Sequence, residues 1–240
     1  MRAVSAIFTK QLNDFPKNIS VAFLYVMYPA LAAVMSFFIP VEGDMEGIGG
    51  SFFTMTFAMM FVGSTPMITI ANTIAEDNEY KSLRFLVMAG VRPHQYLFGL
   101  GAFAMIMSLL PLAAFSLIGS FNLEILMVFV AVALLGCFAS IILGGVIGIF
   151  SKNVQQCAAI YTPLMLVISF MPFLSQFNET IGNISQVLFT HQVFMIFADT
   201  VTTLPPEEFS LPTSMAIIAA NVLVFGVLFA VAYKKRGLKG

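Results

Sequence analysis

The sequence predicts an all-α polytopic membrane protein with six transmembrane helices. Hydrophobic residues make up 59% of its 240 residues and charged residues only 10%, with a mean hydropathy of +0.95. A soluble globular protein carries about 25% charged residues. Six apolar runs are about as long as the roughly 20 residues that a helix needs to cross a bilayer. All Lys and Arg residues fall in alternate segments outside these runs, the two terminal segments included.

The six runs predict one transmembrane domain over residues 1–240. Its spans are expected at residues 19–39, 51–75, 95–119, 125–150, 157–175 and 213–233. Pro66 should kink the second span, and we expect hydroxyls of nearby threonines to satisfy the freed backbone groups. These threonines are Thr65, Thr69 and Thr73. The fourth span carries small residues every four positions, which predicts a face for close helix packing: Gly136, Ser140, Gly144 and Gly148.

Two further segments are expected at the membrane surface. Residues 1–18 carry apolar side chains at helical spacing, which predicts an N-terminal interfacial helix. A signal peptide is the alternative, but the apolar run at residues 19–39 is longer than the usual core of about 7–15 residues. Residues 186–198 are too short to cross and too apolar for a free loop, which predicts a re-entrant extracellular element between spans five and six. Its candidate exit-side residues are Phe189, His191, Phe194 and Phe197.

The distribution of charge predicts the orientation. With the N-terminus inside, all 11 Lys and Arg residues fall in cytoplasmic segments. The outer segments hold eight of the 12 acidic residues and no basic one. Because cytoplasmic loops are enriched in Lys and Arg, we expect a multi-pass protein of the plasma membrane with both termini in the cytoplasm.

The segment Ile74–Pro93, between spans two and three, holds six of the chain's 23 charged residues. Acidic residues come first and basic residues follow, an order that suits the dipole of a helix. Apolar residues then recur at helical spacing, and Gly90 and Pro93 end the pattern. The segment therefore predicts a short amphipathic helix on the cytoplasmic surface. An ordinary solvated loop is the alternative.

This segment resembles the cytoplasmic loop after the second span in ABC type-2 exporter permeases. The resemblance is carried by two acids, a small residue, two leucines and a Gly-Val pair: Glu76, Glu79, Ser82, Leu83, Leu86, Gly90 and Val91. There are departures. Lys81 stands where the family usually has Gly, and Gly90 where it often has Pro. The family also commonly has a Lys near the start of the third span, where this chain has Gly99 and Leu100.

The resemblance implies the permease subunit of an ABC exporter, built from two six-span permeases and two ATPase subunits. The second permease is another copy of this chain or a related one, and ATP and Mg²⁺ belong to the ATPase. A cytoplasmic coupling helix would contact that ATPase through Glu76, Asp77, Glu79, Lys81, Ser82, Leu83, Arg84 and Leu86. The other expected partner is the lipid bilayer, and we expect no nucleic acid.

The sequence offers little for catalysis or ion coupling. No ionisable side chain lies deep in a predicted span, which argues against proton-coupled carriers and selective ion channels. The chain has no phosphate-binding loop and no HExxH motif, so we expect no catalytic residue, metal or cofactor in it. It is therefore not expected to be an enzyme by itself.

The cargo is expected to be apolar or amphipathic. The chain has 26 Phe and 16 Met, and such surfaces adapt to varied partners. Peptides, drugs and lipid-like molecules fit this description, although most of these side chains are expected to face lipid. The alternatives are a non-transporting immunity or sensory subunit and a secondary carrier.

The charge pattern yields a test of topology. Single cysteines that replace Glu46 and Glu207 should react with a membrane-impermeant maleimide added to intact cells, because both positions are expected outside. Labelling at either position only after the cells are opened would contradict the predicted orientation.

Overall fold

The computed structural model describes residues 2–38, 49–82, 88, 90–91, 93–201 and 210–236. This part of the chain is helical and contains no strand. The helices follow in the order α1 (Arg2–Asp14), η1 (Phe15–Lys17), α2 (Ile19–Phe38), α3 (Gly49–Glu79), α5 (Pro93–Ile118), α6 (Leu123–Phe150), α7 (Val154–Met165), the π-helix η3 (Leu166–Phe170), α8 (Met171–Leu174), α9 (Glu179–Ser185), α10 (Phe189–Val201) and α11 (Leu211–Arg236).

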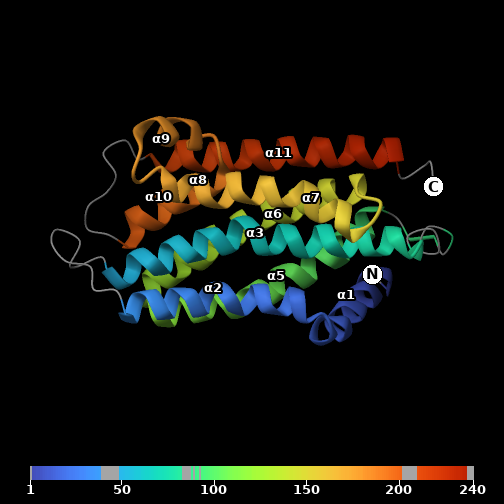
Figure 1. The fold of residues 1–240 in the computed structure, drawn as a ribbon, viewed down its shortest axis with the longest axis horizontal. Helices are drawn as coiled ribbons and strands as arrows, with labels where there is room; N and C mark the ends of the chain where they lie inside the picture. The colour runs from blue at the N-terminus through green and yellow to red at the C-terminus, as the bar shows by residue number, and fades with distance from the viewer. Residues whose placement is uncertain are drawn as a thin grey trace.

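Six of these helical segments are long and apolar enough to cross a membrane, which confirms an all-α, multi-pass membrane protein. They are Ile19–Phe38, Phe52–Glu79, Gln95–Ile118, Leu123–Phe150, Val154–Leu174 and Leu211–Ala232. The fifth is built from α7, η3 and α8 in succession. The helices run up and down along one long axis, and α1 and the end of α11 lie at the same end of the bundle (Figure 1).

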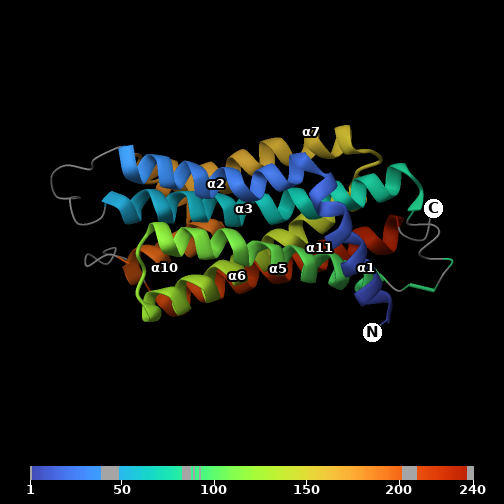
Figure 2. The ribbon, with the colours of Figure 1, turned by 90° about the horizontal axis from the view of Figure 1, so that it is seen from below.

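Helix α3 is the centre of the bundle. It contacts α2, α5, α6, α7 and α10. Of its most apolar stretch of 18 residues, 89% is buried. The corresponding value for α11 is 11%, so α11 lies at the periphery. The two views place α2 and α11 on opposite sides of the bundle (Figures 1 and 2). Helix α2 is therefore positioned through its contacts with α3, and α11 through its contacts with α6.

The row of small residues on α6 packs directly against α3. A methyl group added at Gly144 would overlap the backbone carbonyl of Met67, and one added at Gly148 would come within 2.6 Å of the Ile74 Cβ. At Gly136 it would meet a Val62 methyl at 2.5 Å. Small residues let two helix backbones approach closely, so the spacing of four sets the line of contact between α3 and α6.

Hydroxyl groups on neighbouring helices bind the backbone carbonyls that lie four residues before two of the prolines. Pro66 has no N–H, so the carbonyl four residues earlier, that of Val62, lacks its helical donor. The hydroxyl of Ser140 on α6 donates to that carbonyl. The predicted donors act elsewhere: Thr69 bonds the carbonyl of Thr65, and Thr73 bonds that of Thr69. This part of the prediction is wrong because only a residue on another helix reaches the freed group.

A second proline shows the same arrangement. The carbonyl of Ile168, four residues before Pro172, accepts the hydroxyl of Thr190 on α10. Gly63 of α3 lies beside this contact, since a methyl group there would come within 2.8 Å of Thr190. Backbone groups in the apolar part of a bilayer must find partners within the protein, so these two hydroxyls tie α6 and α10 to the kinked helices.

The two segments outside the predicted spans are both helical. Within residues 1–18, Arg2–Asp14 form α1 and Phe15–Lys17 form η1, and α1 crosses the end of the bundle at an angle to α2 (Figure 1). Its Ile7 side chain packs on Gly99 of α5. Residues 186–198 correspond to α10, which joins α9 through a bend of 108°. Helix α10 contacts α3, α6 and α11, so it is part of the bundle interior.

The contact between α3 and α6 predicts opposite effects for two Gly→Ala substitutions. Gly144→Ala should destabilise the protein by about 1–3 kcal/mol, because the new methyl group overlaps a backbone atom that cannot rotate away. Gly226→Ala on α11, where nothing lies within 4 Å, should be neutral or stabilising by up to about 1 kcal/mol. Thermal unfolding in detergent measures both. Equal unfolding temperatures for the two variants would contradict the close contact of Gly144 with α3.

Candidate functional site

The last turn of α3 carries the acidic residues that the sequence placed at the start of a separate amphipathic helix. Helix α3 continues to Glu79, and the Tyr80 and Lys81 amides close its end on the carbonyls of Glu76 and Asn78. The acids therefore lie at the C-terminal end of a long helix, where the dipole does not favour them. The dipole argument was wrong, and two of the three acids, Asp77 and Glu79, are held by tertiary contacts.

The chain leaves the helix at Lys81, whose φ of 58° lies in the left-handed region. A helix often ends on one left-handed residue, usually Gly. Gly90, with a φ of 77°, is a second left-handed residue where the sequence predicted a helix end.

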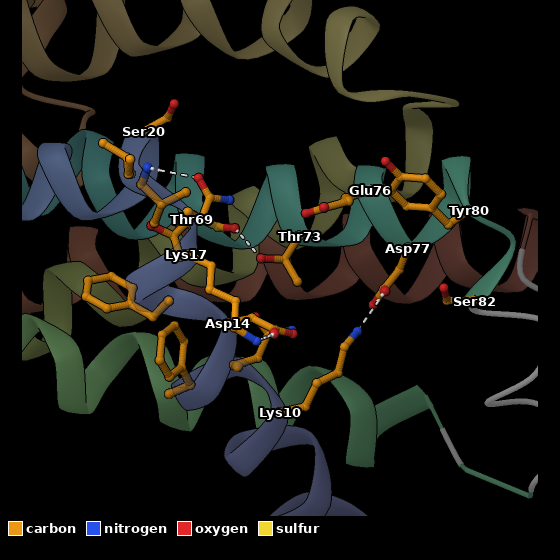
Figure 3. Close-up of a pocket in the computed structure, with 16 residues that line it drawn as sticks. Lys10, Asp14, Lys17, Ser20, Thr69, Thr73, Glu76, Asp77, Tyr80 and Ser82 are labelled. Atoms are coloured by element: carbon orange, nitrogen blue, oxygen red, sulfur yellow. Dashed lines mark hydrogen bonds and ion pairs between the residues drawn. The ribbon is translucent and has the colours of Figure 1, made fainter.

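Asp77 is the buried member of the acidic group. Its side chain is 7% exposed, and one carboxylate oxygen lies 3.1 Å from the Lys10 ammonium of α1. The Tyr96 hydroxyl of α5 donates to the other oxygen at 2.5 Å. Figure 3 shows Lys10 reaching up from α1 to Asp77. A buried carboxylate is stable only when it is paired and hydrogen-bonded, so α1 and α5 are both fixed to the end of α3.

The next two residues fix two more helices. The Asn78 amide donates to the carbonyls of Gly148 and Ser151, at 3.2 and 3.1 Å, where α6 ends. The Glu79 carboxylate accepts the backbone N–H of Val154 at 3.1 Å, where α7 begins. Helix ends leave such backbone groups without partners in the helix itself. Three consecutive side chains therefore join α3 to α1, α5, α6 and α7.

The predicted coupling residues separate into three sets. Asp77 and Glu79 are used within the chain, as described above. Glu76 and Lys81 are exposed and Ser82 is partly exposed. Leu83, Arg84 and Leu86, and with them the predicted apolar stripe, lie outside the described residues.

Lys10, Tyr96 and Asn78 were not identified as site residues from the sequence. Lys10 lies 67 positions from Asp77, and Tyr96 lies 19 positions from it. Tyr96 belongs to another helix, and no local spacing connects it to the acids. The sequence feature that could have pointed to this contact was Lys10, a basic residue of the amphipathic segment at residues 1–18.

A polar cavity of about 650 Å³ lies between α1, the start of α2 and the end of α3. Its walls carry Lys10, Asp14, Lys17, Thr69, Thr73, Glu76, Asp77 and Tyr80, among other residues. Glu76 and Thr73 of α3 line this cavity, and Figure 3 shows Asp14 at the end of α1 and Lys17 of η1 on its other side. This volume is in the usual range for small-molecule sites.

The predicted exit-side residues are core residues. Phe189, His191, Phe194 and Phe197 are between 1% and 6% exposed. The His191 Nδ1 is 2.9 Å from the Ser185 hydroxyl, a contact that spans the bend between α9 and α10. Asn221 of α11 donates to the Val187 carbonyl in the same bend. His191 and Asn221 therefore hold the bend, and the Phe189 and Phe197 rings pack against Phe225 and Phe129. Their role at the exit of a pathway stays a prediction.

Within the described residues, no three His, Cys, Asp or Glu side chains come together in a way that could hold a metal ion. Cys137 and Cys157 are free thiols, both buried. A comparison with models of known protein families gives no match, and a comparison with curated proteins gives none either.

The Asp77 contacts predict a specific loss of stability. Asp77→Asn should lower the free energy of unfolding by about 1–3 kcal/mol, because it removes the charge opposite Lys10 but keeps an acceptor for Tyr96. Asp14→Asn removes the exposed pair with Lys17 and should cost less than about 0.5 kcal/mol. Chemical unfolding in detergent, followed by circular dichroism, measures both. Equal losses would show that Asp77 is no more important than a surface acid.

Proposed function

We propose that this chain is the transmembrane permease subunit of an ATP-driven ABC exporter. The proposal rests on the resemblance of the segment Ile74–Pro93 to the exporter permeases. The observation that carries it is the last turn of α3, where Asp77, Asn78 and Glu79 fasten four other helices. A partner that pushes on the segment after α3 would act on most of the bundle at once.

The mechanism follows from these contacts. The ATPase closes on ATP and Mg²⁺ and displaces the segment that begins at Lys81. Because α3 is the most buried of the six spans and contacts both α6 and α7, its displacement would repack these two helices. The charge-paired end of α3 then transmits the movement to the other helices, and Leu83 and Leu86 form the contact with the ATPase.

The orientation in this proposal places this end of α3 in the cytoplasm of the cell, next to the plasma membrane. The described basic side chains at this end of the bundle come from α1, η1 and the turns after α3 and α6: Lys10, Lys17, Lys81 and Lys152. Both termini share this side. A second permease, either a copy of this chain or a related one, completes the membrane part, and each permease takes one ATPase. The cargo is an amphipathic or apolar molecule.

The test uses the chain together with its ATPase partner. Leu83→Ala combined with Leu86→Ala should weaken co-purification of the ATPase, by roughly 1–3 kcal/mol for each side chain buried in the complex. The matched control is Leu109→Ala with Leu110→Ala, two exposed leucines on α5. Purified alone, the chain should hydrolyse no ATP above background.

Two outcomes would contradict the proposal. Wild-type binding of the ATPase by the Leu83, Leu86 double variant would remove the segment from the interface. ATP hydrolysis by the verified single chain would remove the need for an ATPase subunit. If no ATPase co-purifies at all, the alternative of a non-transporting immunity or sensory subunit, or of a secondary carrier, takes its place.

A further inference from the structure

The polar cavity beside α3 has an excess of one negative charge. Three carboxylates and two ammonium groups line it. Lys10 pairs with Asp77 at 3.1 Å, and Lys17 pairs with Asp14 at 3.3 Å. Glu76, the remaining acid, is exposed and forms no ion pair with any residue in the described part of the chain. The wall therefore holds one carboxylate whose charge no protein cation neutralises.

The Thr73 hydroxyl, one turn before Glu76, also presents an acceptor to the cavity. Its proton is donated to the carbonyl of Thr69 at 2.9 Å. The Thr73 oxygen keeps its lone pairs for a ligand, because a hydroxyl has one proton but two acceptor sites. A group that binds this wall must therefore donate hydrogen bonds and carry positive charge.

An apolar groove of about 460 Å³ adjoins the cavity at Phe15, which lines both. The groove runs between α2 and α5, and its other walls include Tyr25, Val26, Pro29, Met107 and Pro111. Apart from the Tyr25 hydroxyl, these side chains are apolar.

We propose that the cavity and the groove together bind an amphipathic amine. Its ammonium group pairs with the Glu76 carboxylate and donates to the oxygen of Thr73. Its hydrocarbon part passes Phe15 and lies in the groove between α2 and α5. A cation over an aromatic ring gains further stabilisation, and Phe15 and Phe103 supply such rings in the cavity. This inference deepens the proposed function, on which it rests for the role of this ligand as cargo.

Photolabelling of the purified full chain in an uncharged maltoside detergent tests the proposal. The probe is dodecylamine with a diazirine in the middle of its chain, and the control probe is the matching dodecanol. Labelled peptides are identified by mass spectrometry. We expect the amine to label the α2 and α5 peptides of the groove roughly tenfold more than the alcohol does, because hydrogen bonds to charged groups are the stronger ones.

Variants then identify the group that recognises the amine. Glu76→Gln should reduce labelling by the amine to the level of the alcohol, whereas Glu179→Gln, an exposed acid on α9, should leave it unchanged. Should Glu76→Gln fail to fold, Thr73→Val removes a neighbouring acceptor with little change of shape and should reduce amine labelling at least threefold. Equal labelling by amine and alcohol, or full labelling in a folded Glu76→Gln variant, would overturn the proposal.

Competition distinguishes the source of the amine. Phosphatidylethanolamine that displaces the probe would support the ammonium site and assign it to a membrane lipid. Displacement by free alkylamines without competition from that lipid would support the site and assign it to cargo. No ATPase takes part in this experiment. Labelling can therefore succeed while the exporter proposal fails, and an ATPase can bind while the amine site is overturned.

Discussion

The close approach of α6 to α3 is the contact on which the rest of the bundle depends. The small row on α6 brings its backbone against the carbonyl of Met67, and only at this separation can Ser140 reach the carbonyl freed by Pro66. The same line of contact places the end of α6 beside Asn78. One packing face therefore supplies the hydrogen-bond donor for the Val62 carbonyl and sets the position of the last turn of α3.

The last turn of α3 converts this packing into a junction. Asp77 is stabilised by groups from α1 and α5, and its neighbours bind backbone groups at the end of α6 and the start of α7. The same turn forms one wall of the polar cavity, because Glu76 and Thr73 lie on the face toward α2. Mechanical connection and ligand recognition are thus assigned to different faces of one helix.

The sequence predicted what depends on local composition. The six spans agree with the helices to within a few residues, except where α3 continues past Ala75 to Glu79. The small row on α6 was also visible, because its period matches the helix. The role of the acids was not predictable, since helix-dipole reasoning uses only neighbours in sequence, whereas Lys10 and Val154 come from distant parts of the chain. The burial of α10 was not predictable for the same reason, because the helices that cover it, α3, α6 and α11, come from distant parts of the chain.

The composition of α3 has a consequence for how the chain is inserted during synthesis. Its most apolar window has a mean hydropathy of 1.4, the lowest of the six, whereas that of α6 is 2.9. Helix α3 leaves the ribosome before α6, so the Val62 carbonyl has no Ser140 donor at that stage. A weakly apolar helix with an unpaired backbone group enters lipid poorly. Membrane insertion of α3 is therefore expected to be completed only after α6 has been made.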